Sequence, residues 1–202
     1  SFIDRPVDVS GADQIISDNI QGMKLAVEKL YSLGHTKIGL ISGPQDLHIV
    51  NERNIGFQKA MSNLELEINS DWLFSEKFSV NGGRNAAMKL LKQDNHPTAI
   101  ICSSDVLAIG FIDSLIEAGF AVPEYMSVIG FDDISFTKYL RPKLTTIRQA
   151  KYEMGAKAFE MLLARINDKE INPKKIILDV EIKERETVTN PRKENFQKAS
   201  IS

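Results

Sequence analysis

Residues 99–119 decide the fold class, and they read Ala-Ile-Ile-Cys-Ser-Ser-Asp-Val-Leu-Ala-Ile-Gly-Phe-Ile-Asp-Ser-Leu-Ile-Glu-Ala-Gly. A short apolar run at 99–102 precedes a longer stretch with helical spacing from Asp105 to Ala118, and Gly119 ends that stretch. A buried strand that leads into a helix is typical of a parallel sheet covered by helices. This segment therefore predicts an α/β fold.

The same succession of strand and helix is expected on both sides of this segment. Upstream, Asp18-Asn19 can cap a helix that Gly34 stops, and the apolar run Lys37 to Ser42 follows as a strand. The other expected elements are a helix near 52–64, a strand around 72–74, a helix from about 83 to 91, a strand at 127–131, a connecting strand at 144–147, an amphipathic helix over 154–166, and a terminal strand or hairpin over 176–185. A length of 202 residues fits one large domain or two small lobes.

Composition excludes several classes of protein. Apolar residues make up 43% and charged residues 26%, which is typical of a globular protein and not of a disordered one. The 25 basic and 27 acidic residues give a net charge of −2, so this segment alone has no basic field for nucleic acid. No apolar run reaches the ~18 residues of a membrane span.

The cysteine and motif content predicts no metal, cofactor or catalytic centre. The single Cys102 cannot form an internal disulfide, which fits a reducing, cytoplasmic location. His48 and His96 have no partners at metal-ligand spacing, and His35 is expected to be a structural histidine in a turn. The chain also lacks the GxSxG, HExxH, GxGxxG and P-loop patterns, so it is not expected to be an enzyme.

Three segments, taken in order, point to one family. The first is 33–44, Leu-Gly-His-Thr-Lys-Ile-Gly-Leu-Ile-Ser-Gly-Pro, with Arg53 and Gly56-Phe57 after it; the second runs from Cys102-Ser-Ser-Asp through Ala108, Gly110, Gly119 and Val122-Pro-Glu to Val128-Ile-Gly-Phe-Asp-Asp; the third is Leu144-Thr-Thr-Ile-Arg-Gln with Gly155 and Ala156. Over roughly 2–188, these motifs resemble the effector-binding core of the LacI/GalR family of bacterial transcription regulators. That core shares its fold with periplasmic sugar-binding proteins.

The resemblance implies a two-lobe fold with parallel sheets flanked by helices. It assigns 17–145 and 173–189 to a nearly complete C-terminal lobe, 1–16 and 146–172 to a partial N-terminal lobe, and 190–202 to a flexible tail. The helix-turn-helix head and the opening strands of the family core match nothing in this chain, so we expect an N-terminally truncated core without a DNA-binding head.

A partial lobe should leave apolar side chains without partners. We expect Ile147, Met154, Phe159 and Met161 to lose the contacts that a complete lobe would provide.

The resemblance places two charged residues in an effector site. Arg53 stands where the family has an arginine that binds ligand oxygens, and its planar guanidinium can satisfy two acceptors at once. Its alternative role is that of a solvated helix arginine. Asp132 follows a buried strand at the edge where open α/β sheets bind ligands, and its alternative role is to close an Asx turn. Asp133 is expected to form a cap or turn.

Four further residues are candidate ligand contacts. Ser104 and Asp105 either contact the ligand or cap the helix that they begin, and many relatives have Asn in place of Ser104. Phe78 matches an aromatic residue that stacks on ligands in relatives, with core packing as the alternative. Gln149 can reach the cleft from the connecting strand, or it can serve only as part of a hinge.

The functional expectation follows from the resemblance. It is an effector-sensing domain of a transcriptional repressor, dimeric in the intact protein, which binds a small polar molecule in the cleft and controls operator binding through the missing head. A sugar is expected, because Leu47 and Ile49 replace polar contacts of purine-responsive relatives. The alternative is an extracytoplasmic sugar-binding protein of a transport system, which an upstream signal peptide would support. An enzyme is the third and weakest candidate.

Overall fold

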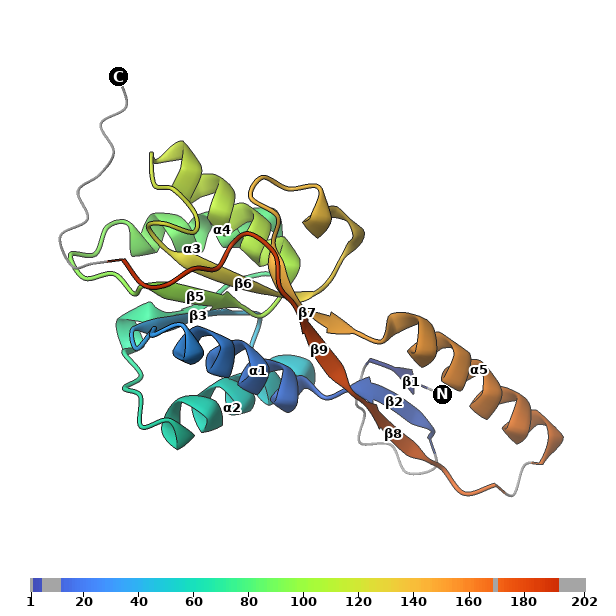
Figure 1. Ribbon diagram of the computed structural model, residues 1–202. Coiled ribbons are helices and arrows are strands. Elements are labelled where there is room, and N and C mark those ends of the chain that lie inside the picture. Colours follow the sequence, from blue (N-terminus) through green and yellow to red (C-terminus); the bar gives the residue numbers. More distant parts are fainter. Residues whose placement is uncertain (1, 5–11, 169–170, 193–202) are drawn as a thin grey trace.

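The computed structural model describes residues 2–4, 12–168 and 171–192, and it has two sheets with five helices packed on them (Figure 1). The strands of the larger sheet are β3 (Ile38–Ser42), β4 (Leu73–Ser75), β5 (Ala99–Cys102), β6 (Ser127–Asp132), β7 (Thr145–Gln149) and β9 (Val180–Lys183). Those of the smaller sheet are β1 (Phe2–Ile3), β2 (Gln14–Ser17) and β8 (Lys175–Leu178). The helices are α1 (Asn19–Ser32), α2 (His48–Asn63), α3 (Val80–Leu90), α4 (Asp105–Glu117) and α5 (Lys151–Asn167). Two short 3-10 helices are also present: η1 (Ser70–Trp72) lies just before β4, and η2 (Ser135–Lys138) lies between β6 and β7.

The α/β prediction is confirmed by the strand order. The larger sheet runs β4-β3-β5-β6-β7-β9, and all of its neighbours are parallel except β9, which is antiparallel to β7. The smaller sheet runs β1-β2-β8 and is parallel throughout. Parallel strands need a crossover helix between them, which explains the alternation of strands and helices in the sequence.

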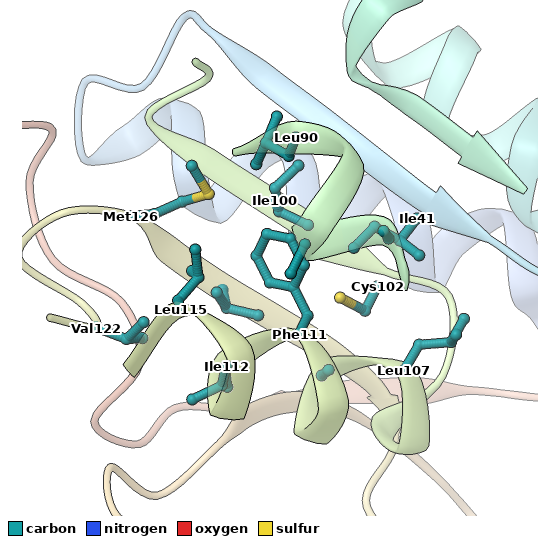
Figure 2. Close-up of a cluster of buried hydrophobic side chains, with 14 of the residues drawn as sticks. Ile41, Leu90, Ile100, Cys102, Leu107, Phe111, Ile112, Leu115, Val122 and Met126 are labelled. Atoms are coloured by element: carbon teal, nitrogen blue, oxygen red, sulfur yellow. The ribbon is translucent and has the colours of Figure 1, made fainter. Parts of the chain in front are cut away.

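Helices cover both faces of the larger sheet. Helices α1 and α2 pack on one face and α3 and α4 on the other, as Figure 1 shows. Phe111 of α4 lies in the hydrophobic core between the sheet and helices α3 and α4, close to Ile100 of β5 and Leu115 of its own helix (Figure 2). Strands β5 and β6 are therefore buried on both faces, and this is why they are continuous apolar runs in the sequence.

The expected cap and stop of α1 are confirmed. Asp18 Oδ1 accepts a hydrogen bond of 2.8 Å from the backbone N–H of Gln21, and Gly34 has a φ of 95° just after the helix. Helix α2 begins at His48, earlier than expected. This start could not be recognised in the sequence, because the N-cap residue, Leu47, has no side chain that caps the helix.

The terminal segment and one strand differ from the expected pattern. Of the two alternatives for 176–185, a strand or a hairpin, the hairpin is wrong, because β8 joins the smaller sheet beside β2 and β9 joins the larger sheet beside β7. Residues 146–149, expected in the partial N-terminal lobe, belong to β7 of the larger sheet. The reason is that β7 leads into α5 through Ala150 alone, and β8 leads into β9 through Asp179 alone, so no loop marks either change.

The segment expected to be a flexible tail is anchored where the structure describes it. Arg192 Nη1 donates to the carbonyl oxygens of Tyr125 at 2.5 Å and Pro97 at 3.0 Å, and its guanidinium lies 4.4 Å from the centre of the Tyr125 ring. The rest of the expected tail, 193–202, lies outside the described residues.

The apolar residues expected to lack partners fall into two groups. Ile147 and Met154 are buried, against the expectation, because Ile147 packs in the α1–α2 core and Met154 packs on Ile15 of the smaller sheet. Met161 also packs against the core of the smaller sheet. Phe159 is 61% exposed, as expected. Helix α5 thus buries one stripe and exposes another.

None of the helices within 2–4, 12–168 and 171–192 has both the length and the apolar character needed to cross a bilayer.

Asp105 connects the start of α4 to β7 of the larger sheet. Its Oδ1 accepts a hydrogen bond of 2.5 Å from Thr146 Oγ1 of β7, and its Oδ2 accepts one of 2.8 Å from the N–H of Ile134. The side chain is fully buried, and this burial raises the pKa of Asp105 to about 7. Its carboxyl group therefore links the start of α4 to β7 and to the segment that follows β6.

Close contact between α3 and α4 depends on two glycines. A Cβ atom on Gly110 would lie 1.9 Å from the carbonyl oxygen of Val80, and one on Gly83 would lie 2.0 Å from that of Leu107. Because both neighbours are backbone atoms of the facing helix, the clash could be relieved only by moving the helices apart.

Gly110→Ala is expected to lower the free energy of unfolding by ~1–3 kcal/mol or more, because α3 and α4 would separate. Gly155→Ala in α5 is the matched control, since nothing lies within 4 Å of the added methyl group. It should raise stability by up to ~1 kcal/mol through helix propensity. Urea denaturation of both variants measures this. Equal stability of the Gly110→Ala variant and the parent protein would show that the helices are not in close contact.

Asp105→Asn is expected to change how stability depends on pH. The folded protein holds this proton up to about pH 7, whereas the unfolded chain releases it near the ordinary pKa of 3.8. The parent protein should therefore lose stability relative to the variant as pH rises from about 4 to about 7, by on the order of 2–4 kcal/mol. Denaturation of both proteins across this range measures the difference. A difference that stays constant with pH would contradict the shifted pKa.

Candidate functional site

A cavity of about 550 Å³ lies between the two sheets, at the carboxyl ends of the larger sheet's strands. Residues of both sheets and of α5 line it: Ile3, Asp4, Ile49, Arg53, Phe78, Ser104, Val106, Asp132, Ile134, Gln149, Lys151 and Met154. Five of the six candidate residues are in this set, and Asp105 is the exception. The structure thus brings together side chains from positions 53, 78, 104, 132 and 149.

Arg53 is the most buried charged group of the cavity, with 2% of its surface exposed. Its Nε donates to Asn19 Oδ1 at 2.9 Å, and its Nη1 donates to the carbonyl oxygen of Ser103 at 2.5 Å. Its Nη2 lies 3.4 Å from Asp132 Oδ1, and its guanidinium stacks 3.7 Å from the centre of the Phe131 ring. Arg53 is therefore not a solvated helix arginine, and most of its donors already have partners within the protein.

Asp132 and Gln149 form a second part of the same network. Gln149 Nε2 donates to Asp132 Oδ1 at 2.6 Å, and Gln149 Oε1 accepts from Ser17 Oγ at 3.1 Å. Burial raises the pKa of Asp132, while Arg53 and Lys151 oppose that change. Gln149 therefore links Asp132, which lines the cavity, to Ser17 at the end of β2 in the smaller sheet.

Ser104 does not cap α4 through its side chain, although it is the N-cap residue. Its Oγ is buried and has no hydrogen-bond partner among the described residues, and the residue lines the cavity. A buried hydroxyl without a partner is unfavourable, and Ser104 Oγ is such an unsatisfied group just beneath the wall of the cavity.

Phe78 and Asp105 differ in their access to the cavity. The Phe78 ring lines the cavity and also covers Gly43, where a Cβ atom would lie 2.3 Å from the ring. Its packing role and its exposure to the cavity are therefore compatible. Asp105 lies behind the wall and is engaged by Thr146 and Ile134, so the structure does not bring it to the cavity.

Two charged lining residues were not predicted from the sequence. Asp4 follows β1, and its Oδ1 is buried without a hydrogen-bond partner among the described residues; burial raises its pKa, opposed by Arg53. Lys151 begins α5 on the same side of the cavity. The position of Asp4 at the carboxyl end of a short strand was the available signal, but a two-residue strand has too little sequence pattern to be recognised.

The chemistry of the cavity suits the binding of a polar molecule. It presents two carboxylates, two cations and a hydroxyl, above apolar surface from Ile49, Phe78 and Met154. Within the part of the chain that the structure describes, no three His, Cys, Asp or Glu side chains form a potential metal site.

Comparison with known proteins agrees with this geometry. Residues 27–188 match the family described as "Periplasmic binding protein-like domain". The HTH-type transcriptional repressor PurR of Vibrio cholerae is 40% identical over 181 residues, which are 90% of this chain and 54% of that protein. The chain thus spans about half the length of the curated relatives that it matches.

Two solved structures of sugar-bound regulators have the same fold. A LacI family transcriptional regulator from Enterococcus faecium with bound ribose is 32% identical, with a TM-score of 0.85 over 94% of this chain and 70% of that one. A complex of the transcriptional regulator CelR with cellobiose is 27% identical, with a TM-score of 0.86 over 92% of this chain and 57% of that one. By sequence and by fold, the chain belongs to the LacI family of transcriptional regulators, of which it represents the periplasmic-binding-protein-like effector core.

Proposed function

We propose that this chain is the effector-sensing part of a transcriptional repressor and that it binds a sugar or sugar derivative between its two sheets. The observation that carries the proposal is the cavity lined from both sheets, with Arg53 and Gln149 both hydrogen-bonded to Asp132 at its floor. The two solved relatives, one with bound ribose and one in complex with cellobiose, support a sugar as the ligand class.

The proposed mechanism uses contacts on both sides of the cavity. Asp4 and Lys151 belong to the smaller sheet and α5, whereas Arg53, Ser104 and Asp132 belong to the larger sheet and its helices. A ligand that contacts both groups stabilises the arrangement in which both reach it, so binding favours one angle between the sheets. In a cytoplasmic dimer with a DNA-binding head, that change would alter operator binding.

We keep the two-lobe organisation within this proposal, but assign 146–149 to the C-terminal lobe and β8, expected in that lobe, to the N-terminal lobe. The larger sheet with α1 to α4 would form the C-terminal lobe, and the smaller sheet with α5 would form a partial N-terminal lobe. The hydrogen bond between Ser17 and Gln149 lies where the two parts meet.

Asp132→Asn is expected to weaken sugar binding by about 10- to 100-fold, because a charged hydrogen bond is worth ~1.5–3 kcal/mol. Isothermal titration calorimetry with ribose and cellobiose measures this, and hypoxanthine represents the competing ligand class. The control is Asp113→Asn on α4, whose carboxylate pairs with Arg84 at the surface and lies outside the cavity lining.

Equal affinity of the parent protein and the Asp132→Asn variant would contradict the site assignment. Binding of hypoxanthine but of neither sugar would contradict the ligand class. Arg53→Ala is a poorer probe, because it would also leave the carbonyl oxygen of Ser103 and the carboxylate of Asp132 unpaired in the interior.

The 202-residue chain is expected to self-associate through α5. Phe159, Leu162, Leu163 and Ile166 are all more than 40% exposed on one side of this helix, which is a large apolar patch for a soluble protein. Sedimentation velocity should show mass increasing with concentration. Leu162→Lys together with Ile166→Lys should abolish this increase, and hydrogen exchange over 151–167 should be faster than over 99–131. A monomer with equal protection in both ranges would refute the prediction.

A further inference from the structure

The chain makes an unusual bend directly after β6. Asp132 has a φ of 116° and Asp133 a φ of 49°, so two consecutive residues with side chains occupy the left-handed region. Such residues are rare there because Cβ meets the backbone, although Asp tolerates the region better than most. The surrounding contacts must therefore hold this bend in place.

The N–H of Asp133 donates to Thr146 Oγ1 at 3.4 Å and that of Ile134 to Asp105 Oδ2 at 2.8 Å, and the Asp133 carboxylate supplies the remaining contacts. Its Oδ1 accepts from Arg185 Nη2 at 2.6 Å and from Thr137 Oγ1 at 3.2 Å, and its Oδ2 accepts from Arg148 Nε at 2.7 Å. Arg185 is itself fixed, since its Nη1 donates to the carbonyl oxygen of Leu144 at 2.7 Å. Burial opposes ionisation, yet the hydrogen bonds from Arg185 and Arg148 keep the pKa of Asp133 below its ordinary value. The side chain is thus a charged clamp onto β7 and the segment after β9.

The two neighbouring carboxylates have different sets of partners. Asp132 contacts Gln149 and Arg53 at the floor of the cavity. Asp133 does not line the cavity, and its partners, Arg148 and Arg185, do not line it either. The direction of the Asp132 side chain depends on its own φ, and Asp132 shares a peptide unit with the anchored residue that follows it.

We propose that Asp133 is a positioning residue that fixes the backbone bend aiming the Asp132 carboxylate at the effector. The consequence for binding rests on the effector role of Asp132 proposed above, whereas the consequence for the backbone does not. Asp133 would then act on the ligand only through its neighbour.

A crystal structure of Asp133→Asn tests the effect on the backbone. Asn tolerates left-handed φ as well as Asp does, so the substitution changes the charge and acceptors of the clamp and not the residue's own freedom. We expect Asp132 to leave the left-handed region and its Oδ1 to move out of contact with Arg53. An unchanged φ and an unchanged distance to Arg53 Nη2 would overturn the proposal. Should this variant not fold, Arg148→Gln removes one donor at a half-exposed position and is judged by the same two measurements.

A double-mutant cycle tests the effect on binding, with ribose and cellobiose as probes. Asp133→Asn should weaken binding by about tenfold in the parent protein and by less than about twofold in the Asp132→Asn background, because its effect passes through Asp132. A tenfold loss that persists in that background would overturn the positioning role. If Asp132→Asn has no effect, or if neither sugar binds, the proposed function fails, and the crystal structure still decides the role of Asp133.

Discussion

The buried guanidinium of Arg53 is the interaction around which the site is organised. A charge removed from water is tolerated only when it is paired and its donors are bonded. Its three partners come from separate parts of the chain: Asn19 at the start of α1, Ser103 at the end of β5 and Asp132 at the end of β6. The hydrogen bonds of this one guanidinium therefore link the carboxyl ends of β5 and β6 to the start of α1 at the cavity floor.

The two sheets are joined beside the cavity by the chain itself and by a hydrogen bond between side chains. The chain passes between the sheets after β2, after β7 and between β8 and β9. Ser17 and Gln149, at the ends of β2 and β7, are joined by a hydrogen bond, and Gln149 also donates to Asp132. Any change in the angle between the sheets has to be absorbed where the chain passes between them, and such a change would also move the Asp132 carboxylate, which lines the cavity.

The larger sheet could be predicted from the sequence because its inner strands β3, β5 and β6 are buried on both faces. Such strands are uninterrupted apolar runs, and glycines mark where the helices end. The smaller sheet could not be predicted as well: β1 has two residues, and β8 alternates exposed and buried positions at the margin of the molecule. The sequence also contains no signal for the change of sheet between β8 and β9, since only Asp179 separates them.

The site residues were predictable to the degree that local position determines their role. Asp132 and Ser104 follow buried strands, and strand ends face the cavity in this fold. Asp105 follows the same strand as Ser104, yet its side chain turns behind the wall to Thr146 and Ile134. Asp4 and Lys151 reach the cavity only because the smaller sheet and α5 pack against the larger part, a tertiary contact that no short motif encodes.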